Sequence, residues 1–253
     1  MKTPWIGTSW KMNKTRAEAR DFALALAGSP IARTGKAHLF VIPPFTAIAD
    51  VAHILSPTRV RVGAQNMHWA DAGAWTGEIS PAMIRDVGAR IVEIGHSERR
   101  AHFGESDETV ALKTAAALAH DLIALVCVGD TRREYEAGET SAVLARQVRA
   151  ALSCIDPGRA RQAVIAYEPV WSIGEGGIPA DPDFANRQHE IIKNETLRVA
   201  AEPLDVIYGG SVNPGNCVAL ASREHIDGLF IGRSAWAAQG YIGIVESVVA
   251  REP

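Results

Sequence analysis

Eight short apolar segments recur along the chain, and most of them are nearly continuous rather than alternating between apolar and polar residues. Continuous runs of this kind are typical of parallel strands that are buried on both faces. The segments comprise residues 5–10, 38–44, 59–66, 90–96, 122–129, 163–170, 205–211 and 227–233. We therefore expect eight buried strands.

Helical signals lie between these segments. Three pairs have the chemistry of a helix N-terminus, namely Thr15 with Glu18, Thr131 with Glu134, and Asp181 with Pro182. The first two have capping-box spacing, and the third supplies a cap followed by a first-turn proline. Leu144, Val148 and Leu152 recur every four residues, which predicts a helix with one buried stripe.

Strand and helix signals alternate eight times without a long linker or a low-complexity segment. This alternation predicts an α/β fold in which residues 1–253 form a single domain. The economical arrangement is a closed (β/α)8 barrel, the TIM barrel, in which a ring of helices surrounds parallel strands. A doubly wound open sheet is the alternative that the pattern leaves open.

Composition narrows the class of protein. Of the 253 residues, 47% are hydrophobic and 22% are charged, as in ordinary globular proteins. A net charge of −3 provides no general field that would attract nucleic acid or an anionic membrane, so we expect neither as a partner. No window approaches the roughly 18 apolar residues of a membrane span, and the first residues do not resemble a signal peptide.

The cysteines agree with a reducing compartment. Cys127, Cys154 and Cys217 are far apart in the sequence and form neither a metal-binding spacing nor an even disulfide set. We therefore expect a cytoplasmic protein without a metal centre.

In a barrel of this kind, function resides at the C-terminal ends of the strands. Here those ends carry many polar residues, namely Ser9, Lys11, Asn13, Gln65, Asn66, His96, Ser97, Glu98 and Glu168. A single charged residue at a strand end is ordinarily a solvated surface residue. The polar ends therefore locate a candidate site without identifying its reaction.

The last two strands are followed by glycines. "YGGSV" contains Gly209, Gly210 and Ser211, and "IGRSAW" contains Gly232 and Arg233. Each loop by itself fits a tight turn. Two such loops after strands seven and eight, where barrels often bind phosphate through backbone N–H groups, favour a phosphate site.

Seven segments together resemble the triosephosphate isomerase family, in the family's order and at its spacing, from about residue 5 to residue 236. They are "WKMN", "GAQN", "GAWTGEIS", "IGHSERR", "AYEPVWSIG", "YGGSVNPGN" and "IDGLFIGR". "GHSERR" and "AYEPVWSIG" are highly specific, whereas "GAQN" is weak by itself. The resemblance implies a cofactor-independent isomerase that moves the carbonyl of a small phosphorylated sugar through an enediol.

The resemblance also implies roles for individual residues. Glu168 is the base that takes the proton beside the carbonyl, and His96 polarises the carbonyl oxygen as a neutral imidazole. Protonation of His96 is disfavoured by the helical turn that starts at Ser97. Lys11 supplies positive charge near the phosphate and the developing oxyanion. Glu98 and Ser97 support the site.

Residues 169–179 resemble the family's lid, which closes over the substrate. Trp171 would stand at its first hinge, and the N–H of Gly174 would meet the phosphate. Closure protects an enediol phosphate from losing its phosphate in water. The second hinge, Gly177-Ile178-Pro179, departs from the usual sequence of the family, which leaves the mobility of the lid open.

Residues 66–80 resemble the loop that reaches into a neighbouring subunit, with Thr76 at its tip. Trp69 and Trp75 would be costly on the surface of a monomer, which favours a homodimer. The alternative is that the two aromatic residues pack locally.

Two positions depart from most members of the family. Ser9 replaces an asparagine whose amide reaches the reacting end of the substrate, and Arg233 replaces a glycine. The segments "GTSWKMNK", "NMHWADAGAWTGEIS" and "FIGRSAW" look more like the branch of erythritol catabolism that converts L-erythrulose 1-phosphate into D-erythrulose 4-phosphate. That substrate carries one more hydroxymethyl group on its reacting carbon, and the shorter Ser9 would provide room for it.

Three hypotheses follow. The favoured one is a tetrulose-phosphate isomerase, an intramolecular oxidoreductase. The second is a glycolytic triosephosphate isomerase that converts glyceraldehyde 3-phosphate into dihydroxyacetone phosphate. The third, a non-catalytic phosphosugar-binding barrel, is disfavoured because Lys11, His96 and Glu168 are all present.

Overall fold

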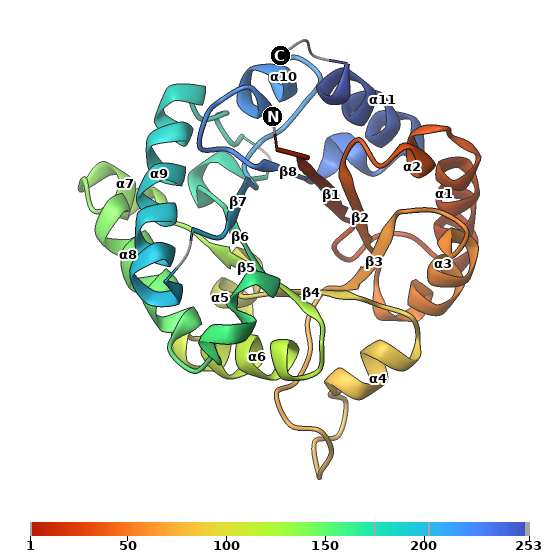
Figure 1. Ribbon diagram of the computed structural model, residues 1–253, viewed down its shortest axis with the longest axis horizontal. Helices are drawn as coiled ribbons and strands as arrows, with labels where there is room; N and C mark the ends of the chain where they lie inside the picture. Colours follow the sequence, from red (N-terminus) through yellow and green to blue (C-terminus); the bar gives the residue numbers. More distant parts are fainter. Residues whose placement is uncertain (1, 175, 202, 251–253) are drawn as a thin grey trace.

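The computed structural model describes residues 2–174, 176–201 and 203–250. Eight parallel strands close into a barrel in chain order, with helices around it (Figure 1). The strands are β1 (Trp5–Ser9), β2 (His38–Ile42), β3 (Arg61–Ala64), β4 (Ile91–Ile94), β5 (Ile123–Val128), β6 (Ala163–Tyr167), β7 (Asp205–Tyr208) and β8 (Gly228–Ile231). Pairing of β1 with both β2 and β8 closes the barrel, which confirms the predicted fold and excludes the open sheet.

Helices follow the strands around the outside of the barrel. The α-helices are α1 (Arg16–Gly28), α2 (Ile31–Thr34), α3 (Ile48–Leu55), α4 (Pro81–Asp86), α5 (Ser97–His102), α6 (Asp107–Ala119), α7 (Arg132–Glu136), α8 (Thr140–Leu152), α9 (Pro182–Ala200), α10 (Cys217–Ala221) and α11 (Ala238–Val249). The 3-10 turns are η1 (Phe45–Ala47), η2 (Pro157–Gln162), η3 (Val170–Ser172) and η4 (Arg233–Ala235). Among the described residues, none of these helices has the length and apolarity that a membrane span requires.

The predicted helix starts are confirmed. Thr15 caps α1 by accepting a hydrogen bond from the N–H of Glu18, whose carboxylate accepts from the N–H of Thr15. The same capping box begins α7, and Asp181 caps α9 with Pro182 in its first turn. In α8, the stripe of Leu144, Val148 and Leu152 is buried.

Alternate strand residues belong to two separate apolar clusters. Ile91 lies in the smaller one, which draws its buried residues from the strands, while the neighbouring Val92 lies in the larger one with the helices. Because side chains alternate across a strand, the smaller cluster is the interior of the barrel. There the ring of Phe40 packs directly against Gly7. A Cβ on Gly7 would lie 2.1 Å from Cζ of Phe40, so the ring fills the space that a side chain at position 7 would need.

The strands end earlier than the apolar pattern predicted. β4 ends at Ile94 and β6 at Tyr167, whereas strands to residues 96 and 170 were expected. His96 and Glu168, which follow the ends of these strands, line the cavity at the rim. The sequence pattern could not separate the last ladder residue from the first residue of the site.

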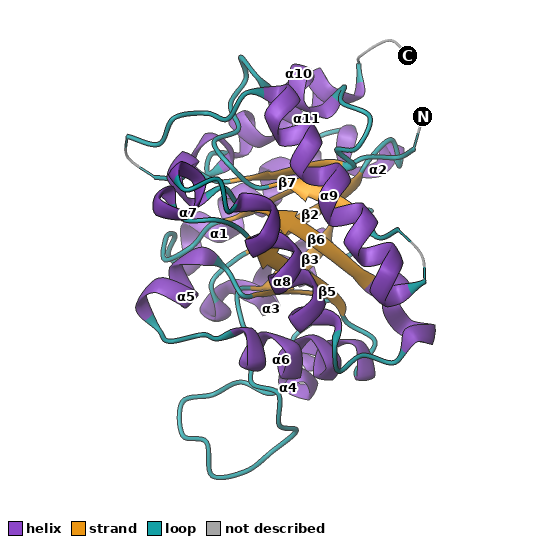
Figure 2. Ribbon diagram, turned by 90° about the vertical axis from the view of Figure 1, so that its left-hand side faces the viewer, coloured by secondary structure: helices purple, strands orange, loops and turns teal. Residues whose placement is uncertain are grey.

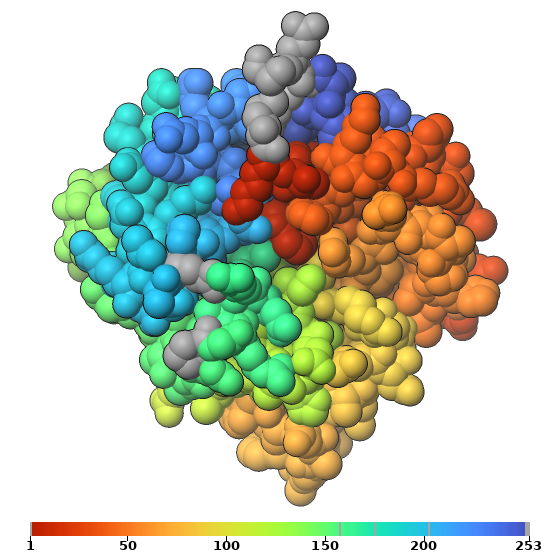
Figure 3. Space-filling model, in the orientation of Figure 1, coloured from red at the N-terminus to blue at the C-terminus, as the bar shows by residue number. Residues whose placement is uncertain are grey.

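One loop breaks the rounded outline. The segment between β3 and α4 projects from the barrel, as the ribbon views show (Figures 1 and 2). The same segment forms the point at the lower edge of the space-filling view (Figure 3). This is the 66–80 loop that was expected to contact a second subunit.

Candidate active site

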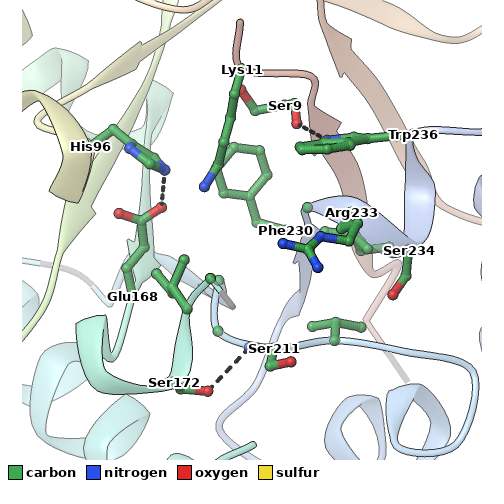
Figure 4. A pocket seen from close by; sticks show the side chains of 17 residues that line it. Ser9, Lys11, His96, Glu168, Ser172, Ser211, Phe230, Arg233, Ser234 and Trp236 are labelled. Carbon is green, nitrogen blue, oxygen red and sulfur yellow. Dashed lines mark hydrogen bonds and ion pairs between the residues drawn. The ribbon is translucent and has the colours of Figure 1, made fainter. Parts of the chain in front are cut away.

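The C-terminal ends of the strands surround a cavity of about 200 Å³. It is lined by Ser9, Lys11, His96, Glu168, Ser172, Ile173, Gly174, Gly209, Gly210, Ser211, Val212, Phe230, Ile231, Gly232, Arg233, Ser234 and Trp236 (Figure 4). All the residues that we predicted to be catalytic or substrate-binding are therefore brought together. The supporting residues Ser97 and Glu98 are not in this lining but contact it, because the N–H of Ser97 donates to Glu168 and Glu98 accepts from Lys11. Thr76 lies on the exposed projecting loop.

Glu168 follows β6 directly and is 2% exposed. Its backbone N–H still bonds to the carbonyl of Val128 at 2.7 Å, so the strand holds the residue rigidly. Its Oε2 accepts a hydrogen bond from the N–H of Ser97 at 3.0 Å. Its Oε1 lies 3.2 Å from Nε2 of His96. The expected base and electrophile are therefore in direct contact.

His96 is the N-cap of α5, and its Nδ1 accepts a hydrogen bond from the N–H of Glu98 at 3.1 Å. An accepting nitrogen carries no proton, so the neutral ring has its proton on Nε2. The ring is thereby set as a neutral hydrogen-bond donor, and Nε2 faces Glu168 (Figure 4).

Lys11 reaches the cavity from the loop after β1. Its backbone adopts φ +53°, a left-handed conformation that is uncommon outside glycine. Gln65 stabilises this turn by donating to the Lys11 carbonyl at 2.8 Å. The ammonium group bonds Oε1 of Glu98 at 2.7 Å. Burial acts to raise the pKa of Glu98, but the hydrogen bond and charge of Lys11 outweigh it and lower that pKa.

The two glycine loops line the cavity, and Gly209 lies beside Glu168, since a Cβ on Gly209 would be 3.0 Å from Cγ of Glu168. A Cβ on Gly210 would lie 2.2 Å from the hydroxyl oxygen of Tyr208, so only glycine fits this turn. At Ser211 the backbone N–H donates to Oγ of Ser172 at 3.2 Å. The side chain of Arg233 points into the cavity from the side opposite His96 (Figure 4). Arg233 therefore adds a second cation to the one supplied by Lys11.

The start of the lid is held by contacts of Trp171 with Asp130 and Tyr135. Trp171 donates from Nε1 to Oδ2 of Asp130 at 3.2 Å and stacks on Tyr135, with ring centroids 4.4 Å apart. Gly174 has φ +88°, which turns the chain at the cavity. Glu175 of the lid lies outside the described residues, and the mobility of the segment stays a prediction.

In the projecting loop, local packing covers part of the aromatic surface. His68 stacks on Trp69 with centroids 4.1 Å apart and contacts Trp75 at 4.6 Å. Trp75 nevertheless remains 52% exposed. Local packing therefore explains Trp69 better than it explains Trp75.

Sequence reasoning missed two buried acids. Asp130, after β5, accepts hydrogen bonds from Tyr167, Thr140 and Trp171 and so anchors the lid. Glu93 lies within β4 and accepts a hydrogen bond from Oγ of Ser9 at 2.8 Å. A charged residue within an otherwise apolar strand was the available signal for Glu93.

The environment of Glu93 is unusual for a carboxylate. Burial raises its pKa to about 7, the neighbouring charge of Glu168 acts in the same direction, and His96 and the Ser9 hydrogen bond act against it. Glu93, His96 and Glu168 also offer ligand atoms within 4.8 Å of one another, a donor set suited to a divalent metal. Because two of the three have the chemical roles described above, we keep the prediction that no metal is needed.

The triosephosphate isomerase family model matches residues 4–248. The chain belongs to the triosephosphate isomerase family. Within the family, it is 58% identical over 243 residues to the L-erythrulose-1-phosphate isomerase of Mesorhizobium japonicum, which covers 95% of each chain. It is also 58% identical to the protein of that name from Brucella abortus, over 95% of this chain and 94% of the relative.

A third relative of the same name, from Rhizobium rhizogenes, is 56% identical over 98% of this chain and 95% of its own length. Family membership confirms the resemblance that the seven segments indicated. It also means that the contact between Glu168 and His96 lies in the scaffold of an isomerase family.

Proposed function

We propose that this protein converts L-erythrulose 1-phosphate into D-erythrulose 4-phosphate without a cofactor. The observation that carries the proposal is the cavity itself, a volume of about 200 Å³ that is lined by Glu168, His96 and Lys11 together with two glycine loops. The names of the three relatives support the tetrulose substrate over a triose.

The reaction moves the carbonyl from C2 to C3. Glu168 removes the proton on C3, and the electrons of that C–H bond form a C2–C3 double bond while the C2 carbonyl oxygen takes up negative charge. The Nε2–H group of His96 donates to that oxygen and stabilises the enediolate. After the proton of the C3 hydroxyl has passed to the oxygen on C2, Glu168 returns its proton to C2, and C3 becomes the carbonyl. No electrons leave the substrate.

The geometry implies one movement. Glu168 is held by the N–H of Ser97 at 3.0 Å, and its other oxygen lies 3.2 Å from His96. To reach a carbon atom, one of its oxygens must turn from His96 into the cavity. Closure of the 169–179 lid over the bound phosphate is the step that we expect to accompany this turn.

Phosphate recognition is assigned to the glycine loops. Gly174, Ser211 and Gly232 line the cavity together with the cations Lys11 and Arg233, and we propose their backbone N–H groups as phosphate donors. The N–H of Ser211 would have to exchange its present acceptor, Oγ of Ser172, for the phosphate. N–H groups at loop turns bind phosphate without requiring a large net positive charge, which suits a chain of net charge −3.

The deciding experiment compares kcat/KM of the full-length protein on L-erythrulose 1-phosphate and on glyceraldehyde 3-phosphate. We expect a preference of about tenfold or more for the tetrulose, the range that one extra carbon-sized group provides. A preference for glyceraldehyde 3-phosphate would instead establish the triosephosphate isomerase hypothesis. Failure to turn over either sugar, with binding of both, would leave the non-catalytic phosphosugar-binding barrel.

We further propose that the protein is a homodimer. The supporting observation is that large apolar side chains are exposed in segments after β1, β3 and β4, namely Met12 at 96%, Trp75 at 52% and Phe103 at 68%. β3 and β4 are adjacent, and β1 lies two strands from β3, so the segments share one side of the rim. In this arrangement Thr76 would sit against a second copy.

A cytoplasmic location is also proposed. Cys127, Cys154 and Cys217 are free thiols in the structure. Unpaired cysteines agree with a reducing compartment. A fusion of the chain to a fluorescent reporter, viewed in the cells that produce it, would test the location.

A further inference from the structure

Glu93 is a buried acid that the mechanism above does not use. It follows Ile91 by two residues in β4, so its side chain points into the barrel interior, and it is 2% exposed. Its Oε2 accepts the Ser9 hydrogen bond at 2.8 Å, and its Oε1 lies 3.8 Å from Nε2 of His96. Glu93 itself is not part of the cavity lining, whereas Ser9 and His96 are.

This contact determines what Ser9 can offer a substrate. A hydroxyl group has one proton to donate and two lone pairs that accept. When Glu93 is ionised it can only accept, so it engages the proton of Ser9, and the hydroxyl of Ser9 can then offer the cavity only its lone pairs. The backbone of Ser9 is held as well, because Trp236 donates from Nε1 to its carbonyl at 3.1 Å. Ser9 is therefore fixed as an acceptor that points into the site.

A purely structural role accounts poorly for an acid at this position. Removing a carboxyl group from water costs free energy that one hydrogen bond only partly offsets. An apolar side chain of similar size would fill the barrel interior without that cost, as Leu125 and Ile207 do in the same cluster. A buried polar pair that borders a substrate cavity is better explained by recognition.

We propose that Glu93 is a positioning residue that acts through Ser9, so that the two side chains select a substrate with a hydroxyl group beyond its reacting carbon. The Ser9 lone pair accepts a hydrogen bond from the C4 hydroxymethyl group of a tetrulose phosphate. This inference rests on the proposed function and adds to it a reason for discrimination, since glyceraldehyde 3-phosphate has no such group.

The probe is the 4-deoxy analogue of L-erythrulose 1-phosphate, which has a methyl group in place of the hydroxymethyl group. In the wild-type protein we expect kcat/KM for the hydroxylated substrate to exceed that for the analogue by about tenfold, the scale of one well-made hydrogen bond. Glu93→Leu keeps the volume but removes the acceptor for Ser9, so this ratio should fall toward one. Glu93→Gln retains an oxygen that accepts from Ser9, so it should preserve most of the ratio.

A double variant tests whether Glu93 acts through Ser9. Ser9→Ala should lower the ratio as Glu93→Leu does, and the combination should lower it no further. Equal losses on both substrates in Glu93→Leu, or fully additive effects on the ratio in the double variant, would overturn the inference. Should Glu93→Leu fail to fold, as judged by circular dichroism, an unchanged ratio in Ser9→Ala would overturn it equally.

The same measurements separate this inference from the proposed function. If the wild-type protein prefers glyceraldehyde 3-phosphate, the proposed function fails. The hydroxylated sugar and its analogue are then compared as competitive inhibitors. If the ratio of the inhibition constants of the two compounds is the same in wild type and in Glu93→Leu, the role of Glu93 is rejected, whatever the preferred substrate.

Discussion

At the scale of single residues, the site contains two buried carboxyl groups on either side of one imidazole. Nε2 of His96 lies 3.2 Å from Glu168 and 3.8 Å from Glu93. In a protein interior, the charge of one carboxylate raises the pKa of a neighbouring carboxyl group. Burial, together with the charge of Glu168, raises the pKa of Glu93 to about 7.

The first prediction concerns the base. Glu168→Gln removes the group that takes the C3 proton but keeps the side-chain shape, so kcat should fall by at least roughly 10² to 10⁴. Binding of inorganic phosphate should persist, because the glycine loops are untouched. Steady-state kinetics and a phosphate titration measure the two effects, and near-normal turnover would reject the assignment of Glu168.

The second prediction concerns Ser9. Ser9→Asn adds bulk where the hydroxymethyl group should lie, and overpacking of about 1 to 3 kcal/mol corresponds to a roughly 10- to 100-fold fall in kcat/KM for L-erythrulose 1-phosphate. Activity on glyceraldehyde 3-phosphate should be retained or rise. An equal fall on both substrates would show that Ser9 serves general site geometry rather than substrate choice.

The third prediction uses the raised pKa of Glu93, whose ordinary value is 4.5 and whose value in the fold is about 7. Between these two pH values the folded protein binds this proton more tightly than the unfolded chain does. Stability from this residue is therefore lost as pH rises through the window. Glu93→Gln does not titrate, so the unfolding free energy of the variant relative to wild type should increase from about pH 4.5 to about pH 7.

The size of that change is on the order of 3 kcal/mol, since the pKa rises from 4.5 to about 7 and one pKa unit corresponds to about 1.4 kcal/mol. Urea denaturation of both proteins across this pH range measures it. The pH-dependent difference isolates the titration from any constant effect of the substitution. A difference that stays flat with pH would contradict the raised pKa.

At the scale of elements, short turns after the strands position the side chains and backbone groups that line the cavity. At the N-terminus of α5 the N–H of Glu98 donates to Nδ1 of His96 and orients the ring. The turn at Gly210 lies so close to Tyr208 that a Cβ would be 2.2 Å from its hydroxyl oxygen. Asp130 connects β5 to the start of the lid through Trp171. The strands themselves contribute rigidity, and their ends contribute the functional groups.

The fourth prediction concerns the phosphate loop. Gly210→Ala forces Tyr208 or the loop to move, so the inhibition constant of inorganic phosphate should rise by about tenfold, the loss of one good hydrogen bond. Gly243→Ala in α11 is a matched control, because its Cβ would meet nothing within 4 Å. Equal phosphate inhibition in the two variants would contradict phosphate binding at this loop.

Unphosphorylated L-erythrulose extends this test. If phosphate binding drives closure of the lid, the sugar without phosphate should lose kcat as well as affinity. Equal turnover of both sugars would remove the phosphate site from the mechanism. A metal chelator should leave the activity unchanged. If a chelator abolished the activity, the cofactor-independent mechanism would be contradicted.

At the scale of the whole molecule, the barrel and its projecting loop suit a two-subunit assembly. The loop carries Trp75, which is 52% exposed, and the neighbouring rim segments expose Met12 and Phe103. Apolar side chains gathered on one side of a rim gain stability when a second copy covers them.

The fifth prediction follows from that surface. Trp75→Glu places a charge in the expected interface, so sedimentation velocity should show a dimer for wild type and a monomer for the variant. Leu197→Glu is the control, because Leu197 is 48% exposed on α9, away from the projecting loop. A wild-type monomer, or a variant that stays dimeric, would contradict the proposed assembly.

The sequence alone determined the order of strands and helices, because apolar runs of strand length and helix caps are local patterns. Through motifs that resemble those of the triosephosphate isomerase family, it also predicted catalytic roles for Lys11, His96 and Glu168, and the structure brings the three residues to one cavity. The barrel followed from eight alternations, and closure through β1 and β8 confirmed it. The last residue of each strand was not predictable, because ladder residues and site residues share the same apolar run.

Only the tertiary structure revealed that Glu93 is paired with Ser9. Ser9 and Glu93 are 84 residues apart in the sequence, on β1 and β4, which do not pair with each other. Their contact exists because closure of the barrel brings inward side chains of different strands together across its interior. In a linear pattern an acid within an apolar strand shows neither a partner nor a pKa. Burial and the neighbouring groups decide both, and these depend on how the whole chain folds.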